Sequence, residues 1–199
     1  LYGGYSLWDT YMSAKSAFLS DDLLSYKPQP GEGANPSLED LMAINKDVAG
    51  WITIDDTHID YPVVQGKDDM EYINKDVYGE FSLSGSIFLS CMNKKDFSDN
   101  YNLVYGHHMA NGGMFGDVVS FTEKSYFDKH KTGELYLLDK TMHIDLFACM
   151  KTSASDSKVY NPQNISKTSE SFKSFLDYVR EAAICYRDSG RQDTGQIIG

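Results

Sequence analysis

The hydrophobic and polar positions divide the chain into a helical start, a β-rich middle and a helical stretch near the end. Apolar residues recur at spacings of three, four and seven over residues 5–26, which predicts one N-terminal helix or two short ones. Residues 27–37 hold three of the five prolines and predict an extended connector. A short helix is expected over 37–46. We therefore divide the chain into an N-terminal segment, residues 1–36, and a main domain, residues 37–199.

After Gly50 the pattern changes to short β-type runs separated by turn residues. The predicted strands are 51–54, 59–64, 86–89, 103–105, 134–138 and 142–149. Short helices are expected within 68–76 and 114–129, and a longer amphipathic helix over 170–187. The fold class expected is mainly β with helices (α+β), a barrel or sandwich of mostly antiparallel strands. Because residues 195–199 read as the beginning of a strand, we expect the protein to continue past Gly199.

Composition removes several function classes. The net charge is −11, from 29 acidic and 18 basic side chains, with no basic cluster, so nucleic-acid binding is not expected. The three cysteines form an odd set without CxxC spacing, which indicates neither a zinc site nor a disulfide framework. No apolar run is long enough to span a bilayer, so either the protein is cytosolic or a membrane segment precedes Leu1.

The segment NLVYGHHMANGGMFGDV, residues 102–118, is the candidate for chemistry. A predicted strand ends at Gly106, and His107 and His108 follow at once in a glycine-rich loop. Loops at strand ends carry functional side chains, and histidine is the side chain that changes charge near neutral pH. The plain alternative is that both histidines cap a turn. A metal site is not expected, because the other three histidines are far apart and lack a ligand motif: His58, His130 and His143.

The run from Gly50 to Val118 resembles class B sortases, the cysteine transpeptidases of the Gram-positive cell surface. The matching segments are GWITIDDTHIDYPVVQGKDDMEYINKD, GSIFLSCMN, DNYNLVYGHHMANGGMFGDV and the later KTSASDSKVYNPQNIS. The YGHxM segment with its trailing GxMF is the most specific of them. The resemblance implies a closed β-barrel with N-terminal helices and a long helix before the last strands. It also implies that His107 is catalytic and that His108 is a neighbour.

The resemblance also implies a nucleophile, an arginine and several substrate-binding residues. The family's nucleophile lies in a Leu-Ser-Thr-Cys-like segment with an arginine on the next strand, both expected beyond Gly199, so the 199-residue species is expected to be inactive. We expect the chain's own thiols to be unpaired and mostly buried rather than nucleophilic: Cys91, Cys149 and Cys185. Four positions match substrate-binding ones in the family, although Asp stands where many relatives have Asn at the first: Asp69, Ile73, Thr152 and Tyr160.

The resemblance implies a reaction and its partners. A sorting-signal peptide of a surface protein is cleaved through a cysteine thioester, and the acyl group passes to an amine of a peptidoglycan precursor or pilin. No cofactor is implied, and the enzyme acts on the extracellular face of the membrane, anchored through an N-terminal segment. Two alternatives stay open: a non-catalytic peptide-binding or pilus-organising surface module, and a cytosolic Cys/His hydrolase. Asn161 and Pro162 are interpreted as a turn into a helix, not as a substrate motif.

Overall fold

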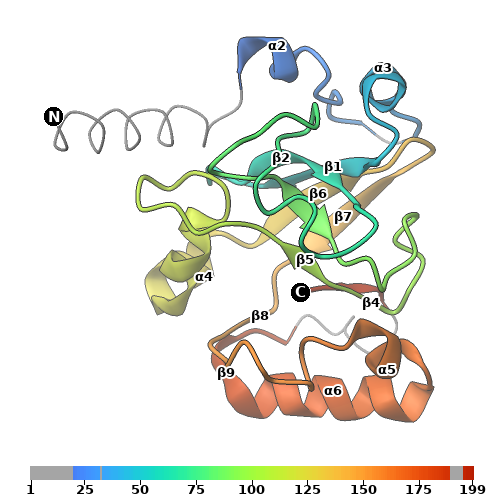
Figure 1. Ribbon diagram of the computed structural model, residues 1–199. Coiled ribbons are helices and arrows are strands. Elements are labelled where there is room, and N and C mark those ends of the chain that lie inside the picture. Colours follow the sequence, from blue (N-terminus) through green and yellow to red (C-terminus); the bar gives the residue numbers. More distant parts are fainter. Residues whose placement is uncertain (1–19, 32, 189–194) are drawn as a thin grey trace, which may run out of the picture.

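The computed structural model describes residues 20–31, 33–188 and 195–199 (Figure 1). The helix predicted over 5–26 lies mostly outside these residues; within them its last part contains α2. The helices, with η1 a 3₁₀ helix, are α2 (Asp21–Leu24), α3 (Ser37–Ile44), η1 (Gly116–Thr122), α4 (Lys124–Lys129), α5 (Pro162–Ser166) and α6 (Ser169–Ala182). The strands are β1 (Val48–Ile54), β2 (Asp60–Val64), β3 (Ile87–Leu89), β4 (Tyr101–Asn102), β5 (Val104–Tyr105), β6 (Thr132–Tyr136), β7 (Thr141–Asp145), β8 (Ala148–Met150), β9 (Ala183–Tyr186) and β10 (Ile197–Ile198).

One curled sheet organises the described part of the chain. Its strand order is β5-β3-β2-β1-β6-β7, and β4, one residue before β5, pairs with β10. Most pairs are antiparallel, as predicted, whereas β2–β3 and β4–β10 are parallel. Figure 1 shows α2 and α3 at one end of this sheet and α6 at the other. The expected class, α+β with a sortase-like sheet, is confirmed.

Strand β1 lies in the middle of the sheet and is buried on both faces. Ile52 and Ile54 point into the core inside the curl, while Trp51 and Val48 pack on the outer face against Leu38 of α3. A strand covered on both faces reads as a continuous apolar run instead of an alternating one. This explains why VAGWITI carries no charged residue.

Helix α6 confirms the amphipathic stripe predicted near the end of the chain. Its buried face packs on the strands that include Tyr101 and Ile197: Phe172, Phe175, Leu176 and Val179. The helix ends at Ala182, however, so the placement of Cys185 on it was wrong. Ala183 has extended backbone, and Cys185 lies on β9 opposite Cys149 of β8. The β-branched and aromatic side chains of this segment suit a strand.

Two further predictions need correction in detail, whereas the short helices predicted within 114–129 are confirmed by η1 and α4. Residues 68–76 form turns rather than a helix. The strand predicted over 142–149 divides into β7 and β8. The turn over Asn161 and Pro162 is as predicted, with the Asn161 side chain accepting the N–H of Asn164 at the start of α5.

The curl of the sheet is open between β7 and β10 in the residues that the structure describes. A cavity of about 420 Å³ lies there, lined on one side by residues 142–146 and on the other by residues 195–198. Each of these two strands has a described partner on one side only. The gap therefore separates two strand edges of the described part of the chain.

Candidate active site

The first of the two adjacent histidines follows directly on the strand that the sequence predicts. β5 ends at Tyr105, and Gly106 then carries the chain between two packed side chains. A Cβ atom on Gly106 would lie 2.3 Å from Ile87 Cδ1 and 2.8 Å from Phe115 Cδ2. A side chain at this position would displace Ile87 and Phe115, so glycine suits the turn that leads into His107.

His107 and His108 have different surroundings. The ring of His107 is half-buried, and its Nε2 lies 2.9 Å from the carbonyl oxygen of Ile73. Its own carbonyl accepts the N–H of Phe115 at 2.9 Å. His108 is exposed and pairs with Met114 in an isolated bridge. A ring held by a second loop is suited to chemistry that needs fixed geometry, which favours His107 over its neighbour.

The loop that carries His107 is itself anchored to the β1–β2 hairpin. The backbone N–H of Met114 donates to the hydroxyl of Tyr61 at 2.8 Å, in a buried position. Asp117 accepts the backbone N–H of His58 at 2.7 Å, and its carboxylate lies 3.0 Å from His58 Nδ1. These contacts join the loop of residues 106–116 to the sheet at its far end, so both ends of the loop are fixed.

The loop between β2 and β3, residues 65–86, brings two of the predicted binding residues to this site. Ile73 supplies the carbonyl that contacts His107. The Asp69 carboxylate accepts the hydroxyl of Ser90 at 3.0 Å and the backbone N–H of Cys91 at 2.6 Å. Asp69 is therefore fastened to the end of β3, with a negative charge directed at that segment.

Tyr160 reaches the site from the other side, through Tyr105. Their rings are nearly parallel, at 7°, with centroids 6.3 Å apart, and the ring of Phe88 lies 5.2 Å from that of Tyr105. Burial raises the pKa of Tyr105 to about 12, and the charge of Asp69 contributes in the same direction. Tyr105 thus lies between Asp69 and Tyr160, two residues before His107. Tyr105 was not predicted as a site residue, because an aromatic side chain in a strand is ordinary. The available signal was its spacing of two residues from His107.

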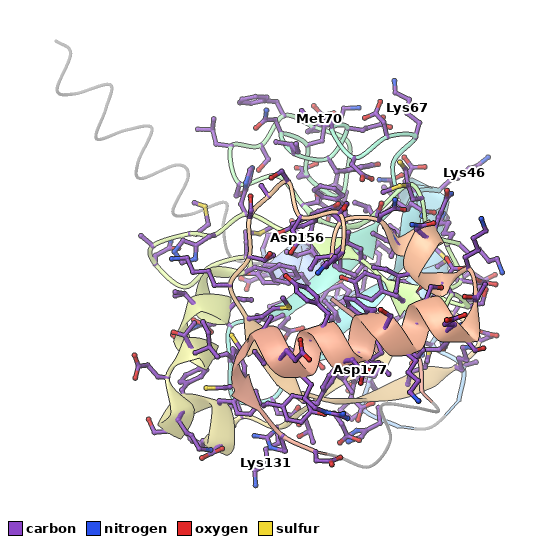
Figure 2. All side chains as sticks on the ribbon, turned by 90° about the horizontal axis from the view of Figure 1, so that it is seen from below. Lys46, Lys67, Met70, Lys131, Asp156 and Asp177 are labelled. Carbon is purple, nitrogen blue, oxygen red and sulfur yellow. The ribbon has the colours of Figure 1, made fainter. Side chains whose placement is uncertain are left out.

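Thr152 is directed elsewhere. Its hydroxyl donates to the Asp156 carboxylate at 2.5 Å, and the same carboxylate accepts the Tyr178 hydroxyl of α6 at 2.6 Å. These hydrogen bonds hold the pKa of Asp156 below its usual range. Figure 2 shows Asp156 beside α6, on which Asp177 is labelled, while Met70 and Lys67 of the β2–β3 loop lie at the top of the view, away from this helix. Thr152 therefore braces the loop of residues 151–161 rather than contacting His107.

The three thiols are unpaired, and their environments differ. Cys185 is buried and Cys149 half-buried, whereas Cys91 is exposed. Desolvation raises the pKa of Cys91, and the nearby Asp69 adds to the effect. Desolvation likewise raises the pKa of Cys149. Since the thiolate is the nucleophilic form, these surroundings disfavour attack by Cys91 or Cys149.

The described residues contain neither a metal-binding cluster nor a membrane-spanning helix. Across residues 20–31, 33–188 and 195–199, no three His, Cys, Asp or Glu side chains are grouped so that they could hold a metal ion. In the same residues no helix has the length and apolar character needed to cross a membrane.

Comparison with known proteins identifies the family. No family model matches the chain. Sortase B of Staphylococcus aureus (strain NCTC 8325 / PS 47) is 28% identical over 93% of this chain and 77% of its own length. Sortase B of Listeria monocytogenes serovar 1/2a (strain ATCC BAA-679 / EGD-e) is 32% identical over 74% of this chain, which spans 58% of that protein.

Comparison with solved structures points to the same family. A Streptococcus pyogenes class B sortase involved in pilus biogenesis is 46% identical, with a TM-score of 0.68 over 75% of this chain and 79% of its own. The Staphylococcus aureus sortase B–substrate complex has a TM-score of 0.76 at 28% identity, over 83% and 75% of the two chains. With its curled sheet and the histidine after β5, the chain belongs to the class B sortases. Sortases of this class are cell-surface cysteine transpeptidases.

Proposed function

We propose that His107 is the catalytic histidine of a transpeptidase that cleaves the C-terminal sorting signal of a surface protein and joins the acyl part to an amine. The observation that carries the proposal is the fixed, half-buried ring of His107, placed directly after β5 and held by the Ile73 carbonyl. Staphylococcus aureus sortase B has been solved with substrate, and a sortase B has been solved with Gly3, which supports a peptide donor and an amine acceptor.

The chemistry is acyl transfer in two steps. A cysteine thiolate attacks the carbonyl carbon of a threonine-like residue, and His107 gives a proton to the departing amine, leaving a thioester. The incoming amine then attacks the thioester, His107 takes its proton, and the thiolate leaves. An arginine with its fixed charge holds the substrate and the developing oxyanion.

Within the proposal, the nucleophilic cysteine and the arginine follow Gly199 in a longer protein. The pairing of β10 supports this, because Gly199 accepts the N–H of Val104 at 2.8 Å and donates to Asn102 at 3.0 Å. A parallel strand that continued in this register would run beside Tyr105 and Gly106 toward His107, advancing about 3.3 Å per residue. The gap between β7 and β10 offers space for a further strand, which accords with a main domain, residues 37–199, that lacks its last strands.

Substrate recognition in this proposal uses both sides of Tyr105. Asp69 and Ile73 contact the sorting signal from the β2–β3 loop, and Tyr160 contacts it from the loop of residues 151–161, which Thr152 braces through Asp156. Because the Streptococcus pyogenes relative is involved in pilus biogenesis, a pilin amine should be tested as the acceptor beside a peptidoglycan amine. The protein acts on the outer face of the membrane, held by an N-terminal anchor.

The test is His107→Ala in the full-length protein, with His108→Ala as the matched control. General acid–base catalysis contributes roughly 10²–10⁴-fold, so cleavage of a sorting-signal peptide should fall by about that factor in His107→Ala. His108→Ala should stay within about twofold, since its side chain is exposed. Near wild-type cleavage by His107→Ala contradicts the proposal. A wild-type protein that binds signal peptides without cleaving any would instead favour the non-catalytic surface module.

A further inference from the structure

We propose that the backbone carbonyl of Ile73 is the positioning group for His107 and that Gly85 sets the place of that carbonyl. The carbonyl accepts the Nε2–H of the ring and leaves Nδ1 as the atom that exchanges protons with substrate. The part of this inference that concerns the reaction rests on the proposed function above; the part that concerns the ring's tautomer does not.

The contact defines which nitrogen carries the proton. A carbonyl oxygen can only accept a hydrogen bond, so Nε2, 2.9 Å from Ile73 O, must be the N–H nitrogen. In the neutral ring Nδ1 then holds the lone pair, and in the charged ring both nitrogens carry protons. The hydrogen bond to Ile73 persists in both forms. His107 can therefore gain and lose a proton at Nδ1 without losing its orientation, as a general acid and base requires.

The position of the Ile73 carbonyl is set by close backbone packing against Gly85. A Cβ atom on Gly85 would lie 2.2 Å from Ile73 O and 2.8 Å from Tyr72 O. Gly85 is buried and has a φ of +59°. Only glycine allows this approach, because any side chain would push two backbone carbonyls away.

Neighbouring serines hold the backbone on either side of Ile73 in place. Ser86 donates its N–H to Tyr72 O at 3.1 Å and its hydroxyl to Lys75 O at 2.7 Å, on either side of Ile73. The hydroxyls of Ser82 and Ser84 lie 3.0 Å apart in a buried pair. The segment of residues 82–86 therefore fixes the turn of residues 72–75 by contacts to its backbone carbonyls, and this turn positions His107.

The first test reads the tautomer directly. In the full-length protein with ¹⁵N-labelled histidine, the ring nitrogens of His107 are followed by NMR at a pH where the ring is neutral. The expected result is an Nε2–H tautomer with an unprotonated Nδ1. A neutral ring protonated at Nδ1 would overturn the inference. This measurement needs no activity, so it stands even if His107→Ala retains cleavage and the proposed function fails.

The second test moves the carbonyl. Gly85→Ala should lower kcat about tenfold to a hundredfold, the cost of a misplacement of about 1 Å, and should mix the His107 tautomers. Gly79→Ala is the matched control, because Gly79 has a φ of +85° but no atom within 4 Å of its Cβ position. It carries similar backbone strain without the crowding, so kcat should stay within about twofold and the tautomer should not change.

A third variant separates the carbonyl from the side chain of the same residue. Ile73→Ala keeps the carbonyl and removes the apolar group, so KM should rise while the His107 tautomer stays as in the wild type. A folded Gly85→Ala protein with unchanged kcat and tautomer would overturn the inference. If that variant does not fold, the wild-type tautomer still decides the matter.

Discussion

Two loops flank Tyr105, and they are held in place by different means. Within the β2–β3 loop, residues 65–86, the turn that carries Ile73 is held at its main chain, by the N–H of Ser86 on Tyr72 O and the close approach of Gly85 to Ile73 O, while the Asp69 carboxylate joins the loop to the end of β3. The loop of residues 151–161 is joined to α6 through side chains: Asp156 accepts hydroxyls from Thr152 and Tyr178. A main-chain contact survives most side-chain changes, except where a glycine is needed for the close approach, whereas a side-chain contact is lost when either partner is replaced.

The difference separates two tasks. The main-chain-held loop delivers the carbonyl that orients His107, so it affects the rate of the chemical step. The side-chain-held loop presents Tyr160 and has no described contact with His107, so it affects the binding of substrate. Surface loops such as residues 151–161 tolerate change in sequence, which suits a surface that selects among peptides. Changes in the first loop should therefore alter kcat, and changes in the second should alter KM.

Tyr105 lies between the two loops, and its replacement should have the largest effect of the variants that test this comparison. Tyr105→Ala removes the ring contacts with Phe88 and Tyr160. At roughly 1 kcal/mol for each contact, kcat/KM for a sorting-signal peptide should fall about thirtyfold, with both kcat and KM changed. Tyr105→Phe keeps the rings and should stay within about threefold. An effect confined to KM would show that Tyr105 serves only one loop.

Replacing Tyr160 should affect the second loop alone. Tyr160→Ala removes one ring contact worth roughly 1 kcal/mol, so KM should rise about fivefold while kcat changes less than about twofold. Tyr160→Phe preserves the stacking and serves as the control. Steady-state kinetics with a sorting-signal peptide make the measurement. A fall in kcat with constant KM would mean that the loop also positions catalytic groups, contrary to the division described above.

Much of the fold could be predicted from the sequence, because strands and helices with one buried face carry a periodic pattern. The α6 stripe of Phe172, Leu176 and Val179 is an example. The strand β9 could not be predicted, since Ala183 and Tyr186 continue the helical spacing. Pairing with β8 across Cys149 and Cys185 decides the conformation there, and tertiary contacts of that kind override local propensity.

The candidate site was predictable to a smaller extent. His107 stood out by its place after a strand and by a family motif. The contact from Ile73 could not be inferred, because a backbone carbonyl leaves no trace in the sequence. The requirement for Gly85 was likewise hidden, since a glycine in a turn has many possible reasons. The role of Tyr105 between two loops depends on residues that are far apart in the chain, and periodicity carries no information about such neighbours.

The smallest effect expected concerns the response of the second loop to acid. Hydrogen bonds from Thr152 and Tyr178 lower the pKa of Asp156, so the ionised carboxylate stabilises the loop. A group with a depressed pKa contributes this stability above its unfolded value, about 3.9 for Asp, and loses it as the pH falls through the folded value. Asp156→Asn removes the charge and should make the loop less protected, by a few-fold, at neutral and mildly acidic pH.

Amide hydrogen exchange, corrected for intrinsic rates, can follow this change. The N–H groups of Val159 and Tyr160 both donate to Asp156 O, so they report on the loop, and the N–H of Ile52 in β1 reports on the sheet. In the wild type, loop protection should stay constant down to about pH 4 and then fall before that of Ile52. In Asp156→Asn it should be lower and nearly independent of pH. The same acid response in both proteins would show that the carboxylate does not hold the loop, and the contrast between the two loops would then need another cause.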